Sequence, residues 1–74
     1  MNTGRLWFDD DKKRTLDEKV RRALEHYRRA ENFQEANTVW VNPATPDVPE
    51  TLSGLRVRTS RTVLPMHFFI GTSE

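Results

Sequence analysis

The stretch from residue 15 to residue 32 constrains the fold of this chain more than any other. Thr15 and Glu18 form a T-x-x-E capping box, in which each side chain accepts a hydrogen bond from a backbone N–H left unpaired at a helix start. An apolar stripe follows at helical spacing within an arc of about 80°, formed by Leu16, Val20, Leu24 and Tyr27. The sequence therefore predicts one amphipathic helix that ends near Asn32, a residue type that tolerates the left-handed conformation.

Composition limits the size of the core that this helix can join. Of the 74 residues, 35% are hydrophobic and 31% are charged, and there is no cysteine. A chain of this length buries only ~60% of its unfolded surface, and neither a disulfide nor a thiolate zinc site can reinforce it. We expect one small folded domain over residues 1–74, with a thin core of the kind that a partner or self-association often completes.

Short runs with an alternation of period two surround the helix. They predict strands over residues 5–8, 37–42, 55–59 and 67–70. In the first run Leu6 and Phe8 lie on one side, and Trp7 lies on the other. The predicted fold class is α+β in the order β-α-β-β-β, with one amphipathic helix packed on a small, mainly antiparallel sheet.

Residues 43–54 show no periodicity and are predicted to form a Pro-rich surface loop. Pro43, Pro46 and Pro49 are three residues apart, which would align them on one edge of a polyproline II helix. The flanking charge expected of a P-x-x-P ligand is missing, because Arg56 is the first basic residue beyond them. We therefore favour a stiff loop over a recruitment motif.

The alternation after residue 55 breaks at Arg61, where an apolar residue is expected. A turn and a β-bulge near residues 59–61 are the two alternatives. Residues 62–64 are then expected to resume a strand, and Pro65–Met66 fits the middle of a tight turn.

The last predicted strand, residues 67–70, is apolar on both faces. Phe68 and Ile70 lie on one side, and His67 and Phe69 lie on the other. Such a strand is expected either to be central in the sheet or to be covered by a partner.

No catalytic or metal-binding constellation is visible in the sequence. His26 and His67 are not related by any ligand spacing, and the three glycines are scattered, so there is no phosphate-binding loop. Asp9–Asp11 lacks the glycine turn and distal glutamate of a calcium loop, and we interpret it as a solvated turn. We expect no enzymatic activity, no metal and no cofactor.

Charge and hydropathy narrow the class of protein further. The formal net charge is only +1. On the predicted helix, Glu18 faces Arg22 and Glu25 faces Arg29 at the favourable i,i+4 spacing, which indicates a solvated, self-neutralised surface. No apolar run reaches membrane-spanning length and no signal-peptide pattern opens the chain. We therefore expect a cytoplasmic protein without membrane contact.

The candidate binding residues cluster in the C-terminal half, and they are Arg56, Arg58, Arg61, His67, Phe69 and Trp40. Arg56 and Arg58 share one strand face about 7 Å apart, and they could contact successive phosphates or a carboxylate-rich surface. Nearby aromatic rings would offer stacking platforms for single-stranded nucleic acid. The competing interpretation is that surface strands carry arginine against aggregation.

These observations favour a non-catalytic protein-interaction or regulatory module. We expect it to bind a partner protein, or itself as a homodimer, through the C-terminal strand, with sheet-edge addition as the mechanism. The alternative is a nucleic-acid-binding domain that uses the face with Arg56, Arg58 and Arg61. The balanced charge favours the first hypothesis.

Overall fold

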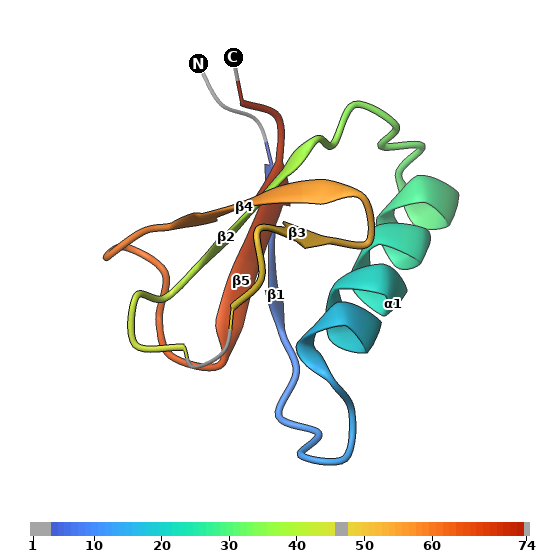
Figure 1. Ribbon diagram of the computed structural model, residues 1–74. Helices are drawn as coiled ribbons and strands as arrows, with labels where there is room; N and C mark the ends of the chain where they lie inside the picture. Colours follow the sequence, from blue (N-terminus) through green and yellow to red (C-terminus); the bar gives the residue numbers. More distant parts are fainter. Residues whose placement is uncertain (1–3, 46–47, 74) are drawn as a thin grey trace.

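The computed structural model describes residues 4–45 and 48–73, which form one helix and a five-stranded sheet (Figure 1). The elements in chain order are β1 (Gly4–Phe8), α1 (Leu16–Ala30), β2 (Thr38–Val41), β3 (Thr51–Leu52), β4 (Leu55–Thr59) and β5 (His67–Gly71). The predicted α+β class, with one helix on a mainly antiparallel sheet, is confirmed. The short strand β3 is an addition to the predicted order.

The strands lie in the order β1-β5-β2-β4-β3 across the sheet. β5 is antiparallel to both β1 and β2, so these two strands run in the same direction and α1 connects them across one face. β2 and β4 are parallel, and β3 pairs with β4 as an antiparallel hairpin. The C-terminal strand is therefore an interior strand of the sheet, which is the first of the two alternatives predicted for a strand with two apolar faces.

Helix α1 begins and ends where the sequence predicts. The Glu18 N–H donates to Thr15 Oγ1 at 3.2 Å, which confirms Thr15 as the N-cap. Asn32 follows the helix with a φ of 52°, and the Phe33 N–H donates to the Tyr27 carbonyl oxygen at 3.2 Å. Phe33 is buried, so the chain folds back on the last helical turn. No helix in the described residues is long and apolar enough to cross a membrane.

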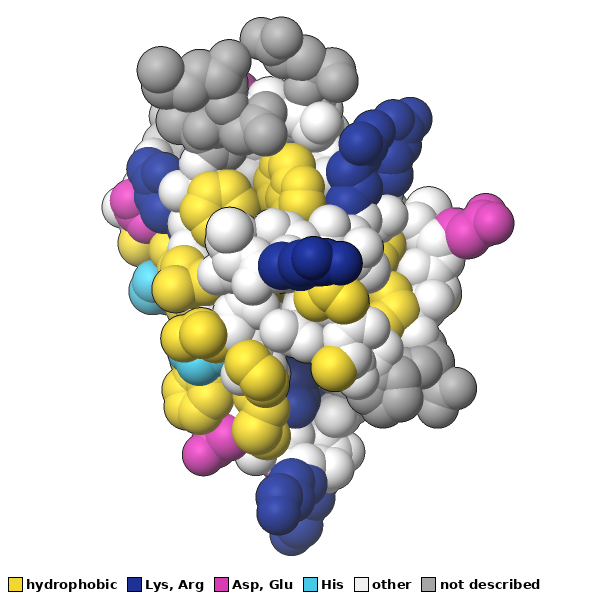
Figure 2. All heavy atoms as spheres, turned by 90° about the vertical axis from the view of Figure 1, so that its left-hand side faces the viewer, with side chains coloured by type: hydrophobic (Ala, Val, Ile, Leu, Met, Phe, Trp, Pro, Cys, Tyr) yellow, Lys and Arg dark blue, Asp and Glu magenta, His cyan; other side chains and the backbone are white. Residues whose placement is uncertain are grey.

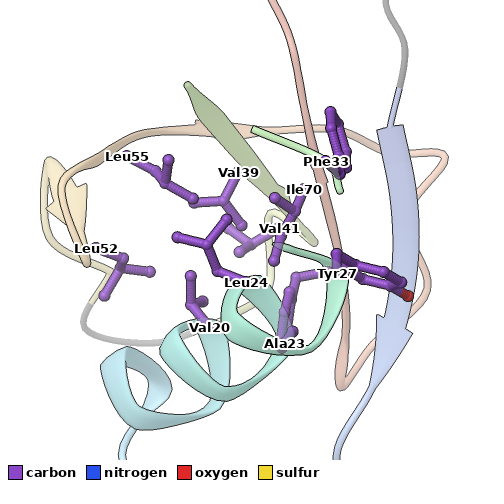
Figure 3. Packing of buried hydrophobic residues seen from close by; sticks show 11 residues of the cluster. Val20, Ala23, Leu24, Tyr27, Phe33, Val39, Val41, Leu52, Leu55 and Ile70 are labelled. Atoms are coloured by element: carbon purple, nitrogen blue, oxygen red, sulfur yellow. The ribbon is translucent and has the colours of Figure 1, made fainter. Parts of the chain in front are cut away.

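The apolar stripe of α1 packs on one face of the sheet (Figure 3). From the helix it contributes Val20, Ala23, Leu24 and Tyr27. From the strands the cluster receives Val39, Val41, Leu52, Leu55, Phe68 and Ile70. Leu24 is only 3% exposed, as its place in the middle of the predicted stripe requires.

The β3–β4 hairpin is held against the start of α1. Its turn consists of Ser53 and Gly54, whose φ values of 51° and 82° fit a two-residue turn in which both φ are positive. The Ser53 N–H donates to Asp17 Oδ1 at 2.7 Å. This hydrogen bond is the main cause that lowers the pKa of the Asp17 carboxyl. Asp17 also pairs with Arg21 at 2.8 Å.

The predicted Pro-rich loop over residues 43–54 is thus shorter than expected, since residues 51–52 belong to β3. Two adjacent residues carry no periodicity of their own, and only the pairing with β4 makes them a strand. Pro46 of the predicted P-x-x-P motif lies outside the described residues. The ion pairs expected at Glu18–Arg22 and Glu25–Arg29 do not form in the structure.

The segment between β4 and β5 turns twice and does not resume a strand, which corrects the prediction for residues 62–64. The Val63 N–H donates to the Ser60 carbonyl oxygen at 3.2 Å, so the alternative of a turn near residues 59–61 holds. The Ser60 and Thr62 hydroxyls lie 2.8 Å apart, and the Thr62 N–H donates to Ser60 Oγ at 3.3 Å. These local hydrogen bonds compete with a sheet ladder.

The second turn has Pro65–Met66 at its centre, as predicted. The His67 N–H closes it by donating to the Leu64 carbonyl oxygen at 3.1 Å, and Met66 has a φ of 65°. This turn delivers the chain into β5.

Candidate interaction surface on the open sheet face

The sheet face opposite α1 carries side chains in rows that cross the strands. Every second strand residue points to this face, and the pairing register fixes which residues are neighbours. The middle row runs from β1 through β5 and β2 to β4 as Leu6, Phe69, Trp40 and Arg58. The row on one side of it contains Gly4, Gly71, Thr38 and Arg56, and on the other side Phe8 lies beside His67. We call these ten residues the open face.

Trp40 and Phe69 form the aromatic centre of the open face. Their ring centroids are 5.5 Å apart with an interplanar angle of 63°, and both side chains are half-buried. The Phe69 ring also lies over Gly4, because a Cβ atom there would collide with Phe69 Cε1 and approach the Ile70 carbonyl oxygen to 2.6 Å. The absence of a side chain at Gly4 therefore lets the ring lie against the backbone of β1.

A second aromatic pair, Phe8 and His67, lies beside the middle row with ring centroids 4.6 Å apart. His67 Nδ1 is 2.9 Å from the Pro65 carbonyl oxygen. Because a carbonyl oxygen only accepts, this hydrogen bond requires the proton on Nδ1. The turn before β5 thus fixes the orientation of the histidine ring.

Large hydrophobic side chains remain exposed on and around the open face. Leu6 is 56% exposed and Phe8 is 53% exposed, although both belong to a strand. Leu64 and Met66, in the segment that leads into β5, are 61% and 50% exposed. Figure 2 shows the side of the molecule away from α1, where groups of hydrophobic side chains lie with histidine among them and with both basic and acidic side chains around them. Exposed large apolar side chains that share one face of a sheet are typical of a binding site.

A hollow of about 390 Å³ opens between the middle row and the segment after β4. Its lining is mostly apolar, with two hydroxyl groups, and consists of Leu6, Trp40, Phe69, Val63, Ser60 and Thr62. The Asn42 side-chain amide donates to the Val63 carbonyl oxygen at 2.8 Å and so ties the loop wall of the hollow to the end of β2.

Positive charge lies along one side of the open face. Arg56 and Arg58 are both exposed on β4, and Arg58 is the register partner of Trp40. Neither arginine makes an ion pair with another described residue. Glu50 shares a surface hollow with Arg58 at the rim without pairing to it. No described strand position of the open face is acidic, so the face changes from apolar at β1 to basic at β4.

Five of the six predicted binding residues lie together on the open face, and only Arg61 does not. It lies in the turn after β4, beyond the last strand residue Thr59. Leu6 and Phe8 also lie on this face but were not predicted as binding residues, because the pairing of β1 with β5 joins residues about 60 positions apart. The sequence did contain one signal for them, because Leu6 and Phe8 lie on the same side of the strand predicted over residues 5–8.

The edges of the sheet are poorly suited to strand addition. β5 has a neighbour on both sides, so the predicted sheet-edge addition through the C-terminal strand is wrong. At the β1 edge, the Gly4 carbonyl oxygen accepts from Arg5 Nη1 and the Leu6 carbonyl oxygen accepts from the Tyr27 hydroxyl, both at 3.0 Å. Burial raises the pKa of Tyr27, so its hydroxyl stays a donor at neutral pH. At the opposite edge β3 is only two residues long.

The acidic run Asp9–Asp11 is engaged in local hydrogen bonds. Asp9 Oδ1 accepts from the Asp11 N–H at 2.9 Å, and Asp11 Oδ1 accepts from the Lys13 N–H at 2.9 Å. Asp11 Oδ2 also pairs with Arg14 at 2.8 Å. Within residues 4–45 and 48–73 no cluster of three His, Cys, Asp or Glu side chains could hold a metal ion.

Comparison with known proteins finds no match, since no family model, no curated protein and no solved structure matches the chain.

Proposed function

We propose that this chain is a non-catalytic protein-interaction module that binds another protein on its open face. The observation that supports the proposal is the apolar side of the open face at and beside the hollow, where Leu6 is 56% and Phe8 is 53% exposed. A small chain gains no stability from leaving such side chains in water, because each one forgoes the free energy of burial. A partner that covers them would supply that burial.

The face, and not an edge, is the proposed contact. The β1 carbonyls that a new strand would need already accept hydrogen bonds from side chains, and β5 is paired on both sides. Aliphatic side chains also favour a protein partner over a nucleic acid, since bases stack on flat rings and not on leucine or methionine.

The second candidate function is binding of single-stranded nucleic acid. It is favoured by one specific observation, the register pair of Trp40 with Arg58, which places a guanidinium beside an aromatic ring. The tilted arrangement of Trp40 and Phe69, at 63°, offers no continuous stacking platform, and the net charge is only +1. These facts place the nucleic-acid hypothesis second.

Site-specific photo-crosslinking tests the proposal inside the cells that express the protein. A benzophenone amino acid replaces Leu6 on the open face and, as the matched control, the exposed Glu25 on α1. We expect a discrete, protease-sensitive adduct from position 6 that is absent from position 25. The adduct should also disappear when Phe8 and Phe69 of the open face are both changed to serine. Equal adducts from the two positions, or adducts that only nuclease removes, would refute the proposal.

A further inference from the structure

We infer that the open face recognises a short segment of its partner that has one large apolar side chain and, two or three residues away, an acidic side chain. This inference rests on the proposed function and adds the chemistry of the bound segment. It is based on the size of the hollow, the length of the middle row and the charge at the end of that row.

The hollow accommodates an apolar side chain of limited size. Its volume of about 390 Å³ is near the lower end of the ~300–1,000 Å³ that is typical of ligand pockets, so it has room for one large anchor side chain. Trp40 and Phe69 form an aromatic floor, and Leu6 and Val63 stand at its sides. Partly buried aromatic pockets that receive one side chain are where interface energy concentrates.

The middle row sets the spacing between anchor and charge. Phe69, Trp40 and Arg58 lie on three successive strands, so Arg58 is two strand spacings, about 10 Å, from Phe69. An extended segment that crosses the strands advances about 3.3 Å per residue. A side chain two or three positions from the anchor therefore comes within reach of the Arg58 guanidinium.

The arginines at the β4 end of the open face determine which charge the second side chain of the bound segment should carry. Arg56 and Arg58 lie on the same face of β4 and make no ion pair with another described residue. A guanidinium binds carboxylate with two parallel hydrogen bonds, which makes Asp or Glu the complementary side chain. A second copy of this chain fits less well, because the ten residues of its own open face include two arginines and no acidic group, and the nearby Glu50 already lines surface hollows with Arg56 and Arg58.

Selection from a phage-displayed library of random 16-residue peptides tests the inference on the folded full-length chain. We expect enriched peptides to share one Leu, Phe, Trp or Met with Asp or Glu two or three positions away. In a selected peptide measured by fluorescence anisotropy, replacing the acidic residue by lysine should weaken binding about 3–10-fold.

Three variants test whether the enriched motif depends on the open face. Arg58→Glu should reverse the flanking preference from acidic to basic while the apolar residue stays enriched. Thr62→Phe, which fills the hollow from its wall, should abolish the apolar enrichment. Arg22→Glu is the matched control, because this exposed arginine lies on α1, and it should leave the motif unchanged. Circular dichroism confirms that each variant is folded.

The outcomes separate this inference from the proposed function. If no motif appears, or if Arg58→Glu leaves the acidic preference intact, the inference is wrong, while a protein adduct at position 6 would still support the proposed function. If sedimentation shows a dimer that Leu6→Ser dissociates, the occupant is a second copy and the inference also fails. If a fluorescein-labelled (dT)20 oligonucleotide binds, with loss on Arg58→Glu and at high salt, both proposals fall.

Discussion

The same strands form both faces of the sheet, but one face is buried and the other is exposed. On the face under α1, Val39, Phe68 and Ile70 are 2% exposed or less, whereas on the open face Leu6 and Phe8 are more than half exposed. The difference follows from strand alternation together with a single helix, which covers only one face. It teaches that the surface that stabilises this small domain is separate from the surface that we propose for binding.

The open face is nevertheless ordered by its own contacts. Thr38 is 2% exposed, and its hydroxyl donates to Asn37 Oδ1 at 2.8 Å. Trp40 and Phe69 are half-buried and in contact. A surface whose rings are held in place loses little side-chain entropy on binding. The face under α1 is therefore buried and stabilises the fold, whereas the open face is exposed and its rings are already held in place.

Truncation of one leucine on each face is the strongest test of this comparison. Leu24→Ala removes a buried side chain of α1 and should lower the free energy of unfolding by about 2–4 kcal/mol. Leu6→Ala, on the open face, should lower it by less than about 1 kcal/mol. Chemical denaturation of both variants measures the difference. Equal losses would show that the open face also carries the stability of the fold.

Gly4→Ala probes the one place where the open face should matter for stability. The new methyl group would displace the Phe69 ring and crowd the Ile70 carbonyl oxygen, at a cost of about 1–3 kcal/mol. Combining it with Phe69→Ala should recover part of the loss, because the colliding ring is then absent. A double variant whose losses simply add, in the same denaturation assay, would contradict the contact.

Loss of the helix cap should have a smaller effect on the covered face. Thr15→Ala removes the acceptor of the Glu18 N–H and should cost about 1 kcal/mol. The control is Thr51→Ala on the exposed edge strand β3, which we expect to change stability by no more than about 0.5 kcal/mol. Thermal denaturation of the two variants compares them, and a harmless Thr15→Ala would mean that the cap contributes nothing.

The smallest expected effect is on the pH dependence of stability. It comes from the hydrogen bond between Asp17 of α1 and Ser53 of the β3–β4 hairpin. The Ser53 N–H lowers the pKa of Asp17 in the folded state, so the charged carboxylate stabilises folding above its unfolded pKa of ~3.9. This contribution is lost as the pH falls through that value and below it. Asp17→Asn should therefore flatten the decline of stability below about pH 4 relative to the unmodified chain. Parallel stability curves of the two proteins between pH 7 and pH 3 would contradict this account.

The sequence by itself determined the local elements and the side to which each residue points. The Thr15 cap, the apolar stripe through Leu24 and the stop at Asn32 all depend on residues within one or two helical turns. The alternation in each strand likewise separates Trp40 from Val39 and Val41 without reference to any other strand. Signals of this range are present in the chain before it folds.

Only the tertiary structure decided which strands become neighbours. It placed β5 between β1 and β2, excluded edge addition through β5, made residues 51–52 a strand and brought Leu6 beside Phe69. These pairings join distant segments, and their choice depends on the burial gained by the whole sheet against the entropy of closing long loops. Local propensity carries no information about that balance, so the row from Leu6 to Arg58 exists only in the folded chain.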